Sequence, residues 1–240
     1  MEEKEKLSNI NENEILPSKS ISATEKFVAE LIGTAFLVFV VTGVPVFSEG
    51  GLLNGAFEAA FVLTSMIYVF GRVSGAHFNP AVTIPMFLRK KITAIECCYY
   101  IFAQLIGAFL GSILVGLCHK GKFKNLSGNS IEADGFWDYF SCFLIEVILT
   151  FGLVFVIFAS TIKENNFGNL TGFIVGISLY FLGITGASVS GGSLNPARSI
   201  APAFIMLFSG EYEPIKQLWI YILAPIIGGI CAGYLTILFE

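Results

Sequence analysis

The chain has 240 residues, of which 55% are hydrophobic and only 13% are charged, and its formal net charge is -4. Soluble domains carry about 25% charged residues, so this composition argues against a water-soluble protein. No phosphate-binding loop, dinucleotide motif, nucleophile–base pair or basic aromatic surface is visible, and the five cysteines have no metal-ligand spacing. We therefore expect neither an enzyme nor a nucleic-acid-binding protein, and no metal or cofactor.

The first 25 residues differ from the rest of the chain. They are polar, mixed in charge and poor in aromatic residues, a composition typical of a flexible segment. They also lack the basic start and short apolar stretch of a cleavable signal peptide. We predict a cytoplasmic tail over 1–25, followed by one membrane domain over 26–240.

Long uncharged runs predict a polytopic all-α membrane protein, because about 18 uncharged apolar residues suffice for a span. Six spans are expected, at about 27–47, 56–73, 94–117, 138–160, 168–187 and 217–239. Twenty-one residues rising 1.5 Å each give about 31 Å, the thickness of a hydrocarbon core. Two shorter pieces, 80–88 and 196–207, would cross only about half of it.

The positive charges predict the orientation of the spans. A cytoplasmic N-terminus places nine Lys and Arg residues inside: Lys4, Lys6, Lys19, Lys26, Arg72, Arg89, Lys90, Lys91 and Lys163. It places four outside: Lys120, Lys122, Lys124 and Lys216. Cytoplasmic loops carry the excess of positive charge, so we expect both termini to be cytoplasmic, although the lysines of the 118–137 loop argue the other way.

The two halves of the chain repeat each other at an offset of 116 residues. Glu30 precedes Asn79 by 49 residues, as Glu146 precedes Asn195. The same offset relates Thr34 to Thr150, Ser74 to Ser190, Gly75 to Gly191, and Pro80-Ala81 to Pro196-Ala197. The third and sixth spans also match, "AQLIGAFLG" from 103 against "APIIGGICAG" from 224. Because each half, about 26–117 and about 138–240, holds three spans, the second must enter the membrane from the opposite side.

Two polar interruptions, "SGAHFNPAVT" at 74–83 and "SGGSLNPARS" at 190–199, precede the two short pieces. Asn is a good helix N-cap and Pro fits the first helical turn, so each interruption should start a half-length helix. In an inverted repeat the two N-termini, with Asn79 and Asn195, would meet near the midplane. Their partial positive charges and amide donors suit a pore that holds water or hydroxyls and repels cations.

These motifs resemble those of the aquaporin, or major intrinsic protein, family over about residues 24–240. "SGAHFNPAVT" and "NPARS" at this separation, with "AELIGT" and "FLIEVILTF" opening the halves, form a specific set. The resemblance implies a bundle of six transmembrane helices and two re-entrant half-helices, a channel domain over 26–240. It also implies a homotetramer in the lipid bilayer, in our interpretation the plasma membrane, with one pore per subunit.

The resemblance further assigns roles to single residues. Glu30 and Glu146 would brace the interrupting loops, and His77, Gly75 and Gly191 would line the pore. A narrow selectivity filter, placed by ungapped spacing, would comprise four positions: Ala59, Gly183, Gly192 and Arg198.

The small side chains at three of the four filter positions predict a wide filter. It would pass water and small neutral solutes such as glycerol, urea, and boric or silicic acid. Against this, Ser199, Ala203 and Tyr221 resemble the strictly water-selective branch. Glu58 either faces the vestibule or a subunit contact, or hydrogen-bonds Arg198 or a passing solute.

Two other functions remain open alternatives. A secondary transporter also uses inverted repeats and broken helices, but the candidate midplane carboxylates, Glu30 and Glu146, are expected near the ends of their spans. A gated or structural membrane protein on the same fold is the second alternative, with the tail or a loop closing the pore.

Overall fold

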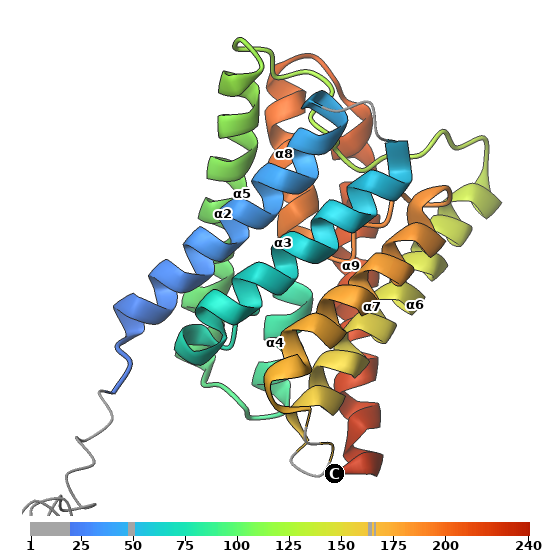
Figure 1. The fold of residues 1–240 in the computed structure, drawn as a ribbon. Coiled ribbons are helices and arrows are strands. Elements are labelled where there is room, and N and C mark those ends of the chain that lie inside the picture. Colours follow the sequence, from blue (N-terminus) through green and yellow to red (C-terminus); the bar gives the residue numbers. More distant parts are fainter. Residues whose placement is uncertain (1–19, 48–50, 163–164, 166) are drawn as a thin grey trace, which may run out of the picture.

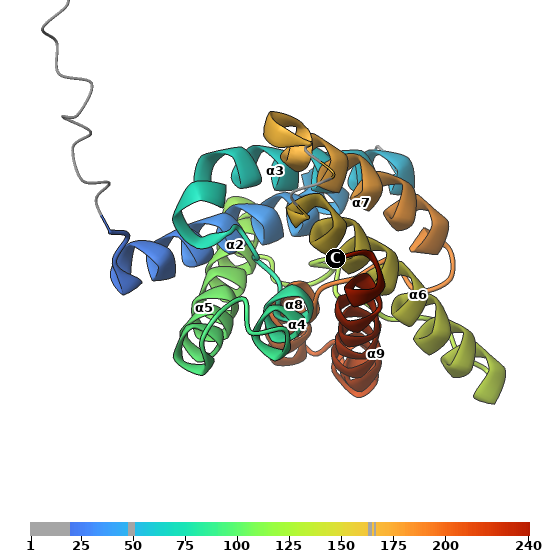
Figure 2. The same cartoon turned by 90° about the horizontal axis from the view of Figure 1, so that it is seen from below.

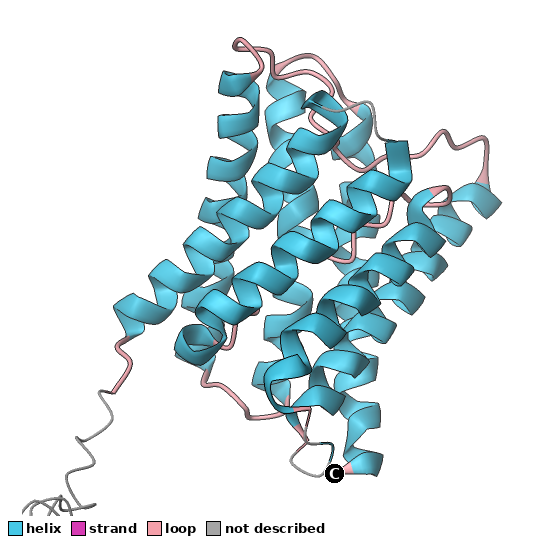
Figure 3. Ribbon diagram, viewed as in Figure 1, coloured by secondary structure: helices cyan, strands magenta, loops and turns pink. Residues whose placement is uncertain are grey.

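The computed structural model describes residues 20–47, 51–162, 165 and 167–240, so the predicted tail lies largely outside the described residues. These residues form helices joined by loops (Figures 1 and 3). The α-helices are α2 (Ala23–Phe47), α3 (Gly51–Ser74), α4 (Pro80–Leu88), α5 (Ala94–Cys118), α6 (Phe136–Thr161), α7 (Thr171–Ala187), α8 (Pro196–Phe208) and α9 (Glu213–Leu235). Two short 3-10 helices are η2 (Gly168–Leu170) and η3 (Thr236–Phe239).

Six of these helices are long and apolar enough to cross a membrane, which confirms the predicted fold class. The half-length helices are α4, with nine residues, and α8, with 13. Seen from the end that carries the C-terminus, they overlap in projection between α5 and α9 (Figure 2). In the side view α4 lies in the lower half and α8 in the upper half (Figure 1). The two half-helices therefore enter the bundle from opposite ends.

Several spans begin earlier than predicted because their first turns hold residues that favour a helix start. We expected the first span to start near residue 27, but α2 starts at Ala23, where Ser22 and Glu25 exchange hydrogen bonds as a capping box. Similarly, α9 starts at Glu213 rather than near 217, with Pro214 in its first turn. Polar residues occupy these first turns, so a hydropathy criterion alone leaves them out.

Repeat-related glycines let the helices of each half approach closely. A Cβ atom on Gly107 of α5 would overlap the Leu31 carbonyl oxygen of α2, and one on Gly228 of α9 would overlap the Val147 carbonyl oxygen of α6. Both glycines lie at matching places in the two repeats, and both face backbone, which cannot move aside like a flexible side chain. The close pairs α2–α5 and α6–α9 therefore form the rigid frame of the bundle.

The cysteines correct one detail of the sequence interpretation. We expected small buried hydrophobic residues, and all five are free thiols. Cys97 and Cys142 are buried, whereas Cys98, Cys118 and Cys231 are exposed on the outside of the bundle.

We predict that Gly228→Ala destabilises the protein whereas Gly55→Ala does not. Both changes replace a helical glycine and should favour the helix intrinsically by about 1 kcal/mol. At Gly55 an added Cβ meets nothing within 4 Å, but at Gly228 it meets backbone. Overpacking of this kind costs about 1–3 kcal/mol. Thermal unfolding of the detergent-solubilised variants measures the difference, and equal midpoints would contradict the close-packing argument.

Candidate functional site

The half-helices begin at two asparagines that cap them in the same way. Asn79 and Asn195 have extended backbones, and each side-chain oxygen accepts a hydrogen bond from the helix, from Ala81 N at 2.8 Å and from Ala197 N at 3.0 Å. Pro80 and Pro196 occupy the first helical position, where a missing N–H costs nothing.

The amide nitrogens of the same two asparagines link the repeats. Asn79 Nδ2 donates to the Leu194 carbonyl at 2.8 Å, and Asn195 Nδ2 donates to the Phe78 carbonyl at 2.9 Å. Both accepting residues have positive φ, 51° at Phe78 and 54° at Leu194, which is rare for bulky side chains. An amide group has two N–H donors, so the reciprocal contact uses one per asparagine and leaves the second for another acceptor.

Two buried carboxylates hold the loops that precede the half-helices. Glu30 accepts hydrogen bonds from the backbone N–H groups of His77 (2.9 Å) and Phe78 (2.7 Å), and also from Ser74 Oγ (2.6 Å) and Gln104 Nε2 (2.8 Å). Non-helical backbone at membrane depth must find such partners within the protein.

Glu146 repeats this arrangement in the second half. It accepts from the backbone N–H groups of Ser193 (2.8 Å) and Leu194 (2.9 Å) and from Ser190 Oγ (2.6 Å). Glu30 and Glu146 are both fully buried.

The position of these carboxylates corrects one expectation. We placed Glu30 and Glu146 near the ends of their spans, but α2 begins seven residues before Glu30 and α6 ten residues before Glu146. They are therefore intramembrane groups, for which partners are obligatory. The Glu30 carboxylate accepts four hydrogen bonds within the protein and the Glu146 carboxylate accepts three. These two carboxylates therefore do not offer the free ion ligands that a coupled transporter would need.

A second layer of matched contacts supports each loop. Tyr100 donates its hydroxyl to the Ser74 carbonyl (2.6 Å), and Tyr221 donates to the Ser190 carbonyl (2.9 Å). His77 Nδ1 lies 3.1 Å from the hydroxyl of Thr83, the residue that corresponds to Ser199 in the second repeat. The two halves therefore build their loops with the same geometry from partly different side chains.

One cavity of ≈ 530 Å³ passes between the repeats. Lys26, Arg72 and Lys91 line it. They belong to the start of α2, the end of α3 and the turn after α4, which lie at the same end of the bundle (Figure 1). Deeper along it lie the residues of the two interruptions, and Ala59, Gly192 and Arg198 line it as well. Of the predicted pore-lining residues, His77 and Gly75 line this cavity, whereas Gly191 does not.

The four predicted filter positions come together, although not in equal roles. Ala59, Gly192 and Arg198 line the cavity, but Gly183 does not. Gly183 lies beside Gly192, where an added Cβ on Gly192 would come within 3.1 Å of the Gly183 carbonyl oxygen. At this point the wall of the cavity is formed by the backbone of Gly192, which packs against the backbone of Gly183.

The partners of Arg198 were missed by the sequence analysis. The guanidinium donates from Nη1 to the Ser127 carbonyl (2.8 Å) and to Asn129 Oδ1 (2.5 Å), and from Nη2 to Ser127 Oγ (3.4 Å). The possible hydrogen bond from Arg198 to Glu58 is not formed. The new partners belong to the 119–135 loop, whose only sequence signal is the short polar stretch "NLSGNS".

The fold and the site together define a class: a membrane channel built from six spanning helices and two half-helices that meet end to end. A family model described as "Major intrinsic protein" matches residues 17–236, and the chain belongs to that family.

Individual relatives agree with this assignment. A glycerol uptake facilitator protein-like 6 of Lactiplantibacillus plantarum is 37% identical over 214 residues, which cover 87% of this chain and 95% of that protein. Nodulin-26 of Glycine max is 36% identical over 220 residues, covering 90% and 78%. The X-ray structure of the aquaglyceroporin from Plasmodium falciparum superimposes with a TM-score of 0.79 at 25% identity, covering 90% of this chain and 96% of that one.

We predict that Glu146→Leu abolishes water permeation. The substitution leaves the N–H groups of Ser193 and Leu194 buried without acceptors, at a cost of about 1–3 kcal/mol each, so the second loop should lose its conformation. Stopped-flow light scattering on proteoliposomes measures the effect per reconstituted protein.

The control for this experiment is Glu132→Leu, at an exposed position of the 119–135 loop. It should retain wild-type flux. Wild-type flux in Glu146→Leu would show that the carboxylate is dispensable and would contradict the bracing role.

Proposed function

We propose that this protein is a passive transmembrane channel for water and small neutral solutes, and that it excludes ions and protons. The observation that carries the proposal is the reciprocal bonding of Asn79 and Asn195, because it brings two helix N-termini together at the wall of one continuous cavity. A solute oxygen can accept the remaining amide N–H of either asparagine as it passes.

The charges around the cavity support the exclusion of cations. Each half-helix N-terminus carries a partial positive charge, and Arg198 adds a full one further along the same cavity. The nearby carboxylates of Glu30 and Glu146 are fully buried and turned toward the loops. A cation or proton at the half-helix junction therefore meets a positive potential, whereas a neutral solute does not.

The small residues of the predicted filter support the passage of solutes larger than water. Ala59 and Gly192 add almost no side-chain volume to the cavity that Arg198 also lines, and one relative is named glycerol uptake facilitator protein-like 6. We propose glycerol, urea, and boric or silicic acid as candidate solutes. A strictly water-selective channel is the alternative, which the hydroxyl of Ser199 and the buried Tyr221 favour by resemblance.

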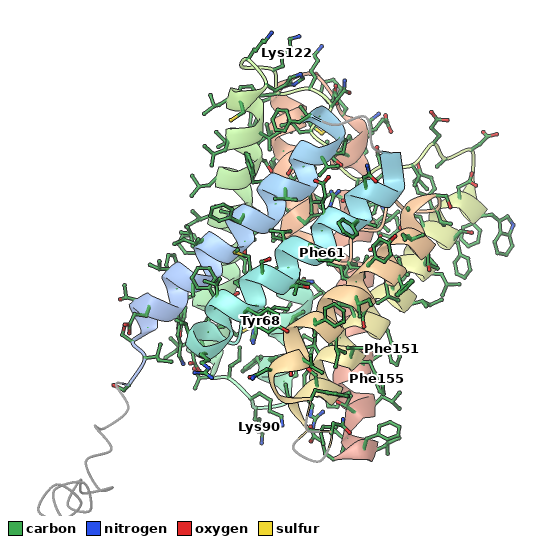
Figure 4. The ribbon with its side chains drawn as sticks, viewed as in Figure 1. Phe61, Tyr68, Lys90, Lys122, Phe151 and Phe155 are labelled. Atoms are coloured by element: carbon green, nitrogen blue, oxygen red, sulfur yellow. The ribbon has the colours of Figure 1, made fainter. Side chains whose placement is uncertain are left out.

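We further propose a homotetramer in the plasma membrane with both termini cytoplasmic. The best span windows of α3 and α7 are only 11% and 22% buried within one protomer, and aromatic side chains such as Phe61 and Tyr68 project outward from α3 (Figure 4). Lys90 lies at the end of the bundle where α2 begins and where the C-terminus lies, and Lys122 lies at the other end (Figure 4). The excess of positive charge predicted for the terminal side favours the cytoplasm there.

We expect wild-type proteoliposomes to pass both water and glycerol, and Ala59→Trp to reduce glycerol flux much more than water flux. The indole would project into the cavity beside Arg198 and occupy the space that a polyol needs. Stopped-flow light scattering with osmotic gradients of sucrose and of glycerol measures the two permeabilities.

Phe102→Trp is the control, since it introduces the same side chain on α5, at a position 60% exposed on the outside of the bundle. It should leave both fluxes unchanged. If the wild type passes water but no glycerol, the wide-filter proposal is wrong and the water-selective alternative holds.

A further inference from the structure

The loop between the two repeats is fixed at both ends of one short segment, 125–131. Leu126 is fully buried in a cluster with Val115 and Met206. At the other end, the backbone N–H and carbonyl of Ile131 make two hydrogen bonds with the side-chain amide of Gln217, at 2.8 and 2.9 Å. The residues between these two anchors therefore have a defined position, at the end of the bundle opposite the C-terminus (Figure 1).

Asn129 lies in the middle of this segment, and its side chain is turned inward. The residue is only 5% exposed. Its Oδ1 atom accepts two hydrogen bonds, from Arg198 Nη1 at 2.5 Å and from Ser199 Oγ at 2.8 Å. One atom of the loop thus holds two consecutive residues of α8, including the charged residue that lines the cavity.

The repeat explains why a loop residue has this position. In the first half, the hydroxyl of Thr83 accepts a hydrogen bond from Gln104 Nε2 of α5, at 2.9 Å. The third and sixth spans align so that Gln104 corresponds to Pro225, and proline has no side-chain amide. In the second half, the equivalent hydroxyl of Ser199 donates instead to Asn129 Oδ1. Asn129 therefore gives this hydroxyl a side-chain amide partner that the sixth span cannot provide.

We propose that Asn129 is a positioning residue that sets the bore of the filter by holding the Arg198 guanidinium against the loop. The proposal rests on the channel function proposed above. Ala59 and Gly192 line the same cavity as Arg198 and contribute almost no side-chain volume that could confine the guanidinium. Within the described residues, the side-chain hydrogen bonds of the guanidinium end on Ser127 and Asn129. The bonds to Ser127 alone would restrain the guanidinium less.

The proposal predicts a change of selectivity rather than a general loss of flux. Without the Asn129 acceptor, the guanidinium enters the lumen and obstructs glycerol more than water. The ratio of glycerol to water permeability in Asn129→Ala proteoliposomes should fall by about tenfold, the population shift expected from loss of one charge-assisted hydrogen bond. Asn129→Asp keeps the acceptor oxygen and should return the ratio to the wild-type value.

Two controls separate positioning from simple destabilisation. Ser130→Ala changes an exposed neighbour in the same loop and should leave both permeabilities unchanged. In an Arg198→Ala background, Asn129→Ala should have no further effect on the ratio, because the group that it positions is gone. If Asn129→Ala does not elute from a size-exclusion column as the wild type does, Asn129→Ser replaces it. Asn129→Ser is a smaller change that should also lower the ratio of glycerol to water permeability.

The outcomes distinguish this inference from the channel function. If the wild type passes neither solute, the proposed function itself fails. If the wild type passes both, but Asn129→Ala keeps the wild-type ratio or lowers both permeabilities equally, Asn129 is not a positioning residue. Failure of Asn129→Asp to restore the ratio, or a further fall of the ratio in the Arg198→Ala background, would also overturn the inference.

Discussion

The structure depends on one constraint: two stretches of non-helical backbone lie inside an apolar bundle, where their N–H groups cannot reach water. Glu30 and Glu146 satisfy this constraint by accepting hydrogen bonds from consecutive backbone N–H groups. Those contacts fix the loops, the loops fix the N-termini of α4 and α8, and the N-termini define the centre of the cavity. The cost of two buried carboxylates is offset by the backbone groups that they satisfy.

Much of this arrangement could be predicted from the sequence because it follows from local chemistry and counting. Asn followed by Pro marks a helix start, the 116-residue offset marks the repeat, and three spans per half require an inversion. The spacing also placed Ala59, Gly192 and Arg198 on one cavity. These inferences needed only residue type and separation along the chain.

Other parts depend on three-dimensional placement that spacing does not encode. Spacing assigned Gly183 and Gly192 to the filter alike, yet Gly192 lines the cavity whereas Gly183 lies beside it with its carbonyl oxygen toward Gly192. Asn129 had no counterpart in the repeat, so nothing in the sequence connected it with Arg198. Sequence symmetry thus predicts what the two halves share and misses the contacts in which they differ.

The reciprocal asparagine bonds also bear on the order in which the protein is built. Each joins residues more than a hundred positions apart, 115 for Asn79 with Leu194 and 117 for Asn195 with Phe78. Contacts between such distant residues form late, since the intervening chain must be ordered first. The first repeat can pack its own helices and brace its own loop, but its Asn79 amide has no protein acceptor until the second repeat has been synthesised and inserted. The centre of the pore therefore cannot be completed before the second repeat is in place, and neither half-chain contains a finished one.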